Sequence, residues 1–130
     1  MADIQLSVVT PERTAIDTVA DFVVVPFPDG EKGIGNHHSP LIARLGYGEL
    51  RFESSGQTQR YYVDGGFVQV RDNRIVVLTG RVIAAGELDV DDARKRIDEA
   101  MKMAIVDDES LDKRDRLVEQ ARAQIKVAAR

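Results

Sequence analysis

Residues 86–105 read GELDVDDARKRIDEAMKMAI, and this stretch divides the chain into two parts of different composition. All ten glycines, all four prolines and all seven aromatic residues lie before residue 87. Because glycine and proline mark turns, the first part is expected to consist of many short elements. The 44 residues that follow contain neither and carry dense mixed charge, which favours long exposed helices.

Apolar residues beyond this boundary recur with the period of a helix. One predicted face collects residues spaced three or four positions apart, namely Val90, Ala93, Ile97, Ala100, Met101, Ala104 and Ile105. The pattern stops at 107–109 and resumes from Leu111 to Ala128. Asp89 is placed to cap the first helix and Ser110 to cap the second. A connection of about four residues favours antiparallel neighbours, so the sequence predicts a helical hairpin.

The part before the boundary shows the period of β-strands. Ile4, Leu6 and Val8 alternate with Gln5 and Ser7, as expected for a strand with one buried side. Turn signals recur every eight to twelve residues or so, which is typical of a sandwich or barrel, at 29–30, 46–48, 54–56, 64–66 and 72–73. The predicted fold class is α+β. The strand and turn patterns indicate about eight to ten strands, so an all-β sandwich of about ten strands is expected at residues 1–86. An antiparallel two-helix hairpin is expected at residues 87–130.

The predicted hairpin can bury little apolar surface by itself. Its two helices share a single thin seam, and each is close to the length that is marginally stable alone in water. We therefore expect the hairpin to be held by docking against the sandwich and to be able to detach from it.

Composition excludes several classes of function. The chain has no cysteine, which excludes disulfides, thiolate metal sites and cysteine nucleophiles. A formal net charge of −4 argues against a nucleic-acid partner, because duplex binding needs a basic stripe. No apolar run approaches the ~20 residues that span a bilayer, and the N-terminus lacks the pattern of a signal peptide. We expect a protein on the cytosolic side without direct membrane insertion.

The sequence offers little catalytic chemistry. The glycines of 30–35 have neither the dinucleotide-binding spacing nor that of a P-loop. Adjacent histidines such as His37 and His38 rarely bind one metal ion with both rings. No group of acidic residues with the spacing of metal ligands lies near them in the sequence. The serines are scattered and none forms a nucleophile elbow. The sequence therefore predicts no catalytic residue, no metal site and no enzyme activity of the chain by itself.

Four motifs occur in order along the whole chain. They are LSVVTP at 6–11, GEKGI at 30–34 with HSPL at 38–41, GGFVQV at 65–70 with Asn73 and VVL at 76–78, and ELD at 87–89. Each motif alone is modest, but the four together resemble the epsilon subunit of F-type ATP synthases. The fold of that family, a flattened ten-stranded sandwich with a C-terminal helical hairpin, agrees with the fold predicted from the residues.

The resemblance implies a non-catalytic subunit of the rotating central stalk. The sandwich would dock on the gamma subunit and on the membrane ring of proton-carrying subunits, and would help to couple proton flow to ATP synthesis. The hairpin would reach the catalytic head of alpha and beta subunits and inhibit ATP hydrolysis. The protein would lie on the cytoplasmic face of the bacterial inner membrane, peripheral through the complex.

The resemblance also suggests functional residues. A loop that follows the family motif supplies the expected partner-binding residues, namely Glu31, Gly33, Ile34, His38, Pro40 and Leu41. Relatives that bind ATP on the hairpin carry an I/L-D-x-x-R-A motif, of which Leu88, Asp89 and Ala93 match. Asp92 stands where the arginine would be, and an acid repels phosphates. We therefore expect no cofactor, with ATP binding to the hairpin as the alternative that Asp92 disfavours.

A second class of function is a free-standing β-sandwich module that binds a small ligand or a carbohydrate. Such a module needs exposed aromatic side chains on a concave face. Only Tyr47, Tyr61 and Tyr62 are candidates, and neighbouring strand residues such as Tyr61 and Tyr62 point to opposite faces.

Overall fold

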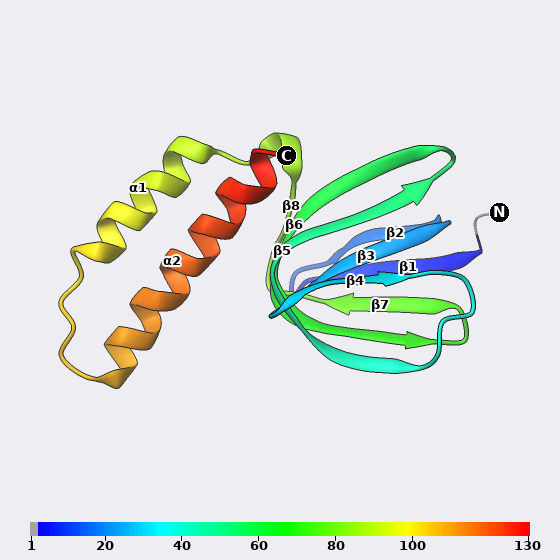
Figure 1. Ribbon diagram of the computed structural model, residues 1–130, viewed down its shortest axis with the longest axis horizontal. Coiled ribbons are helices and arrows are strands. Elements are labelled where there is room, and N and C mark those ends of the chain that lie inside the picture. The colour runs from blue at the N-terminus through cyan, green and yellow to red at the C-terminus, as the bar shows by residue number, and fades with distance from the viewer. Residues whose placement is uncertain (1–2) are drawn as a thin grey trace.

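The computed structural model describes residues 3–130 and consists of a β-sandwich with two antiparallel helices at one end (Figure 1). The strands are β1 (Ile4–Val9), β2 (Thr14–Ala20), β3 (Phe22–Phe27), β4 (Gly30–Ile34), β5 (Leu41–Ser54), β6 (Gln57–Arg71), β7 (Arg74–Leu78) and β8 (Val82–Ala84). A short 3-10 turn (Ala85–Glu87) leads to α1 (Val90–Met101) and α2 (Asp108–Ala128). The predicted fold class, a sandwich followed by two helices, is confirmed.

The strands form one hydrogen-bonded sheet that folds over itself. Their order is β2-β1-β7-β6-β5-β3-β4, and β8 pairs with β6. The β1–β7 pair is parallel, while the other strand pairs are antiparallel. The apolar core comes from strand residues, including Ile4, Leu6 and Val8 as the alternation predicted, and the main cluster of buried core residues contains no residue of α1 or α2.

The structure has eight strands among the described residues, at the lower end of the eight to ten that the strand and turn patterns predicted. The difference arises at the glycines of 46–48 and 65–66, which lie inside β5 and β6 instead of ending them. These two strands are 14 and 15 residues long and stay paired along almost their whole length. Glycine permits a sharp bend within a paired strand, so the bends resemble turns in the sequence.

Gly66 shows why glycine is required at one of these bends. Its φ is +102°, and a Cβ atom there would lie 1.8 Å from the carbonyl oxygen of Leu78 on the neighbouring chain segment. The close approach of the two backbones therefore depends on the absence of a side chain.

The predicted hairpin forms with two local differences. Asp89 caps α1 as predicted, since its carboxylate accepts a hydrogen bond from the Asp92 amide at 3.0 Å. The cap of α2 is Asp107 and not Ser110. Asp107 accepts from the Ser110 amide at 2.8 Å while the Ser110 hydroxyl accepts from the Asp107 amide at 3.1 Å. The serine is thus the third helical residue of a reciprocal capping box.

The first helix ends earlier than its apolar spacing predicted. It stops at Met101, so Ala104 and Ile105 lie in the connection and Ile105 is exposed. Apolar spacing carries no stop signal of its own, and this segment has no glycine or proline to provide one.

Candidate interaction surfaces

The outward faces of β5 and β6 form the platform on which the hairpin rests. Leu50 and Phe52 of β5 point into the core, so the residues between and before them, Arg51 and Glu49, point outward. Their register partners on β6 are Arg60 and Tyr62, which therefore share the same outer face. Helix α2 lies against this face, while α1 packs on α2 from outside (Figure 1).

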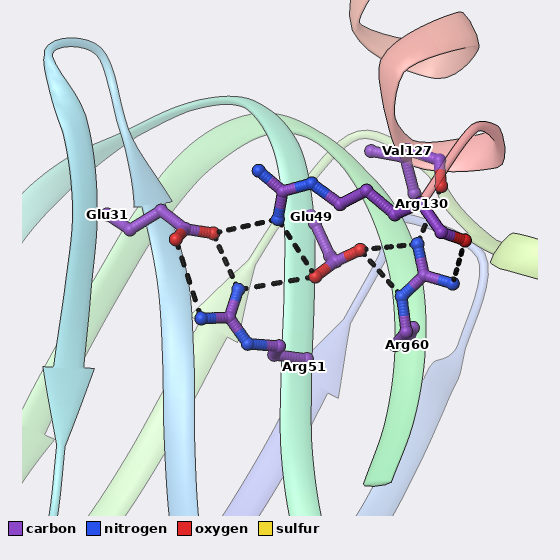
Figure 2. Close-up of polar contacts among 6 residues, drawn as sticks. All are labelled: Glu31, Glu49, Arg51, Arg60, Val127 and Arg130. Atoms are coloured by element: carbon purple, nitrogen blue, oxygen red, sulfur yellow. Dashed lines mark hydrogen bonds and ion pairs between the residues drawn. The ribbon is translucent and has the colours of Figure 1, made fainter.

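A buried carboxylate, Glu49, gathers three arginines on this platform (Figure 2). Its side chain is 3% exposed. Arg60 reaches its Oε2 atom with Nε at 2.8 Å and Nη2 at 2.7 Å. Arg51 and Arg130 each place Nη1 near Oε1, at 3.2 and 3.3 Å. We call these residues, together with the neighbouring Glu31, the Glu49 cluster.

Glu31 shares two of these arginines. Arg51 donates to both of its carboxylate oxygens, at 2.7 and 3.4 Å, and Arg130 approaches Oε2 at 3.4 Å. The hydrogen bond from Arg51 is the main reason that the pKa of Glu31 lies below its usual value, and the charge of Arg130 acts in the same direction. Glu31 is therefore an anion that already has partners within its own chain.

The same cluster holds the end of α2. Arg60 donates from Nη2 to the carbonyl oxygen of Val127 at 2.6 Å and from Nη1 to that of Arg130 at 3.2 Å. The last carbonyls of a helix lack partners within the helix and form the negative end of its dipole. Arg60 thus joins a buried carboxylate of the sandwich to the last turn of the hairpin.

A second set of polar contacts lies further along α2. The Tyr62 hydroxyl donates to Asp64 Oδ1 at 2.6 Å, and Gln120 Nε2 donates to the same atom at 3.0 Å. Burial, followed by the contact with Asp64, raises the pKa of Tyr62. Arg96 of α1 donates to Gln124 Oε1 at 2.6 Å, and Gln124 Nε2 is buried without a hydrogen-bond partner among the described residues. The hairpin therefore rests on an interface in which several polar contacts accompany a few small apolar side chains, and such mixed contacts are characteristic of interfaces that can separate.

An exposed apolar patch extends over the parts of β5 and β6 beyond the hairpin, and onto β7. Ile42 is 75% exposed, Phe67 50% and Leu78 52%, and the sheet register places Phe67 between Arg44 and Leu78. The Arg44 guanidinium lies 5.9 Å from the centre of the Phe67 ring. We call these four residues the Phe67 face. Exposed patches of this kind mark interaction sites.

Sequence reasoning missed the Phe67 face, although a signal was present. Val68 and Val70 are buried, so alternation along β6 places Phe67 on the outer side. The alternation within 67–70 is therefore the signal of an exposed aromatic residue.

The predicted partner-binding residues divide into two groups. Glu31 belongs to the Glu49 cluster at the hairpin. His38, Pro40 and Leu41 lie in and just after the loop between β4 and β5. A hydrogen bond from the His37 amide to Asn73 Oδ1 at 2.8 Å joins this loop to the β6–β7 turn. The His38 ring nitrogen Nδ1 lies 2.7 Å from the Ser39 carbonyl oxygen.

The two residues between these groups make contacts within the sandwich. Ile34 is 1% exposed and belongs to the core, so its side chain does not reach the surface. At Gly33, a Cβ atom would lie 2.7 Å from the Phe22 ring, so the glycine makes room for that aromatic side chain.

The residues that match the ATP motif contribute to the start and the packing of α1. Asp89 caps α1, and the Ala93 side chain is buried. Leu88 and Asp89 line a hollow of about 280 Å³. Asp92, which also lines it, is held by Arg96 at 3.0 Å. The hollow therefore contains the carboxylate that distinguishes this chain from ATP-binding relatives.

The three tyrosines do not form an exposed aromatic platform. Tyr61 stacks on Phe52 with ring centres 6.1 Å apart, and Tyr62 is fully buried under the hairpin. Tyr47 is half-buried beside Gly65.

Within residues 3–130, no three histidine or acidic side chains gather as a metal site. In the same range, no helix is both long and apolar enough to cross a membrane.

Comparison with known proteins gives one consistent result. Residues 3–85 match the family model for the ATP synthase delta/epsilon chain, beta-sandwich domain. The chain is 46% identical over 125 residues to the ATP synthase epsilon chain of Rhodopirellula baltica, covering 96% of this chain and 98% of that one. It is 38% identical over 128 residues to the epsilon chain of Anaeromyxobacter sp. strain K, covering 96% and 97%.

A solved structure shares the fold. A chain in the mitochondrial ATP synthase of Euglena gracilis (OSCP/F1/c-ring, rotational state 1) superimposes with a TM-score of 0.85 at 21% identity, covering 100% of this chain and 83% of that one.

Proposed function

The chain belongs to the epsilon chains of ATP synthase, and we propose from this premise that it is a rotor subunit of the central stalk that helps to couple proton flow to ATP synthesis. The observation that carries this proposal is identity at 46% over nearly the full length of both chains, hairpin included. An epsilon chain is a stalk and regulatory subunit and not a catalytic one. The proposed place is the cytoplasmic face of a bacterial membrane, peripheral through the complex.

The proposed gamma-docking surface is the Phe67 face. It presents three large apolar side chains around a guanidinium, and apolar and arginine side chains are typical of the centre of a protein interface. Its position beyond the hairpin leaves it accessible while α2 is docked.

Co-purification tests the stalk role directly, because a stalk subunit should retain gamma in near-equal amounts and a free-standing ligand-binding module should not.

The proposed ring-facing surface is the loop around His38 and Pro40. This loop is exposed and is braced by Asn73, so it presents a defined shape on a rigid scaffold. Glu31 remains a second candidate, but in the docked state its carboxylate is engaged by Arg51 and Arg130.

Substitutions at these two positions separate the alternatives. If the His38 loop faces the ring, His38→Ala should reduce the coupling of ATP hydrolysis to proton pumping while the isolated protein stays folded. Because Glu31 also pairs with Arg51 and Arg130 in the Glu49 cluster, Glu31→Lys is tested in a chain that lacks residues 87–130, where it should reduce coupling only if Glu31 contacts the ring. The measurement is proton pumping per ATP hydrolysed in membrane vesicles, with thermal unfolding as the folding control. Unchanged coupling in His38→Ala would remove this loop from the proposed surface.

The hairpin is proposed as a brake on ATP hydrolysis. Because the main core cluster contains no hairpin residue, deletion of residues 87–130 should leave the sandwich folded and the complex assembled. ATP hydrolysis by the assembled complex should then rise severalfold. The assay compares hydrolysis rates of complexes with full-length and shortened chains at equal subunit content. An equal rate in the two complexes means that the hairpin is not a brake in this enzyme.

A further inference from the structure

The Glu49 cluster contains more positive than negative side-chain charge while the hairpin is docked. Three guanidinium groups, those of Arg51, Arg60 and Arg130, face two carboxylates, Glu31 and Glu49. The excess charge is met by the end of the hairpin, because Arg60 donates to the carbonyl oxygen of Val127 in the last turn of α2 and to that of Arg130 just beyond the helix. A helix C-terminus carries about half a negative charge. The docked cluster is therefore complete only when the helix end is present.

The same cluster is also balanced when the helix is absent. Withdrawal of α2 removes Arg130 together with the helix carbonyls. It leaves Arg51 and Arg60 with Glu31 and Glu49, all of which lie on the sandwich. Two cations then face two anions, so no buried charge is left without a partner. An unpaired buried charge would oppose release, because it is costly to keep such a charge out of water.

The docked state carries a penalty one helical turn before Val127. Gln124 is buried there, and its Nε2 atom lies near the Tyr62 hydroxyl but makes no hydrogen bond of good geometry among the described residues. Such an atom regains water when the hairpin leaves. The docked and released states of the hairpin are therefore close in free energy. The contact is partly polar, the cluster charges are compensated in both states, and the Gln124 amide regains water on release.

We propose that the Glu49 cluster is an electrostatic latch for the hairpin, in which Arg60 is the residue that grips the end of α2. This inference deepens the proposed regulatory role of the hairpin by assigning its release to named residues. Among the hydrogen bonds of the described residues, Arg60 joins Glu49 to the end of α2, whereas Arg51 joins Glu49 to Glu31 and has no bond to the helix.

The two arginines provide a matched pair of variants. Arg60→Gln and Arg51→Gln remove the same charge from the same cluster, but only Arg60→Gln removes the contacts to the helix end. The full chain has no cysteine, so spin labels at Thr58→Cys and Lys113→Cys would report the distance between the sandwich and α2. Both positions are exposed.

In the isolated full chain, Arg60→Gln should raise the ratio of released to docked hairpin by about tenfold or more, since it removes hydrogen bonds from a charged donor. Arg51→Gln should leave the distance distribution near that of the parent chain. Raising the salt from about 0.05 M to about 0.5 M should favour release in the parent and less so in Arg60→Gln, because salt screens the latch.

Two results would overturn the latch. One is an unchanged distance distribution in Arg60→Gln, and the other is equal release in Arg60→Gln and Arg51→Gln. Far-UV circular dichroism confirms that each variant is folded, and Arg130→Gln, which alters only the hairpin side, provides an independent variant with the same expected direction. This test needs no partner subunit. If Arg60→Gln releases the hairpin but leaves ATP hydrolysis of the assembled enzyme unchanged, the proposed brake fails and the latch stands.

Discussion

Gly66→Ala is expected to destabilise the sandwich by about 3–5 kcal/mol, which is a large part of the stability of an ordinary domain. The added Cβ would lie 1.8 Å from the Leu78 carbonyl oxygen and 2.9 Å from the Thr79 Cα atom. Both are backbone atoms, so relief requires the β6 and β7 segments to move apart. The positive φ of Gly66 adds the strain of a conformation that alanine rarely adopts.

The matched control is Gly86→Ala. A Cβ atom at Gly86 meets nothing within 4 Å, and its backbone is not in the positive-φ region, so the stability of this variant should stay within about 0.5 kcal/mol of the parent. Urea unfolding followed by far-UV circular dichroism compares the two. Similar midpoints for both variants would mean that the bend in β6 can open at little cost, contrary to the close backbone approach in the structure.

Phe67→Glu is expected to weaken binding to the gamma subunit by about 100-fold or more, if the Phe67 face is the docking surface. Buried aromatic residues at the centre of an interface contribute about 2–4 kcal/mol, and burying a carboxylate against an apolar partner adds a desolvation penalty. The side chain is half exposed in the free chain, so its replacement should leave the fold stable. Binding would be measured with purified gamma by calorimetry or surface immobilisation.

Val106→Glu is the control for this experiment. Val106 is 82% exposed in the helix connection, so the same type of change occurs away from the Phe67 face. It should bind gamma with the affinity of the parent chain. Equal affinity of Phe67→Glu and the parent would exclude the Phe67 face as the docking site, while leaving the family membership of the chain untouched.

The two-part organisation follows from local patterns, and for that reason the sequence alone predicts the fold class. Alternation identified Ile4, Leu6 and Val8 as core residues, and an acidic cap marked the start of α1 at Asp89. These features depend on neighbours within a few residues. The same local reading failed at the long strands, since the glycines that bend β5 and β6 have the same sequence signature as glycines that end a strand.

The interaction surfaces depend on contacts between residues that are far apart in the chain. Nothing local distinguishes Glu49 from any exposed strand carboxylate, and its burial arises from the packing of α2 over β5 and from the arginines that converge on it. Likewise, Glu31 and the His37–His38 loop belong to one sequence motif, but Glu31 contacts Arg130 at the hairpin and the loop is bonded to Asn73 in the β6–β7 turn.

Sequence by itself therefore determined which part of the chain forms strands and which forms helices, which residues of the regular segments face the core, and the family to which the chain belongs. Tertiary structure decided which outward-facing residues the hairpin covers and which, like Phe67, stay exposed. The physical reason is that side-chain direction follows from the period of each element, whereas the partner of an outward side chain is set by which distant segment packs over it.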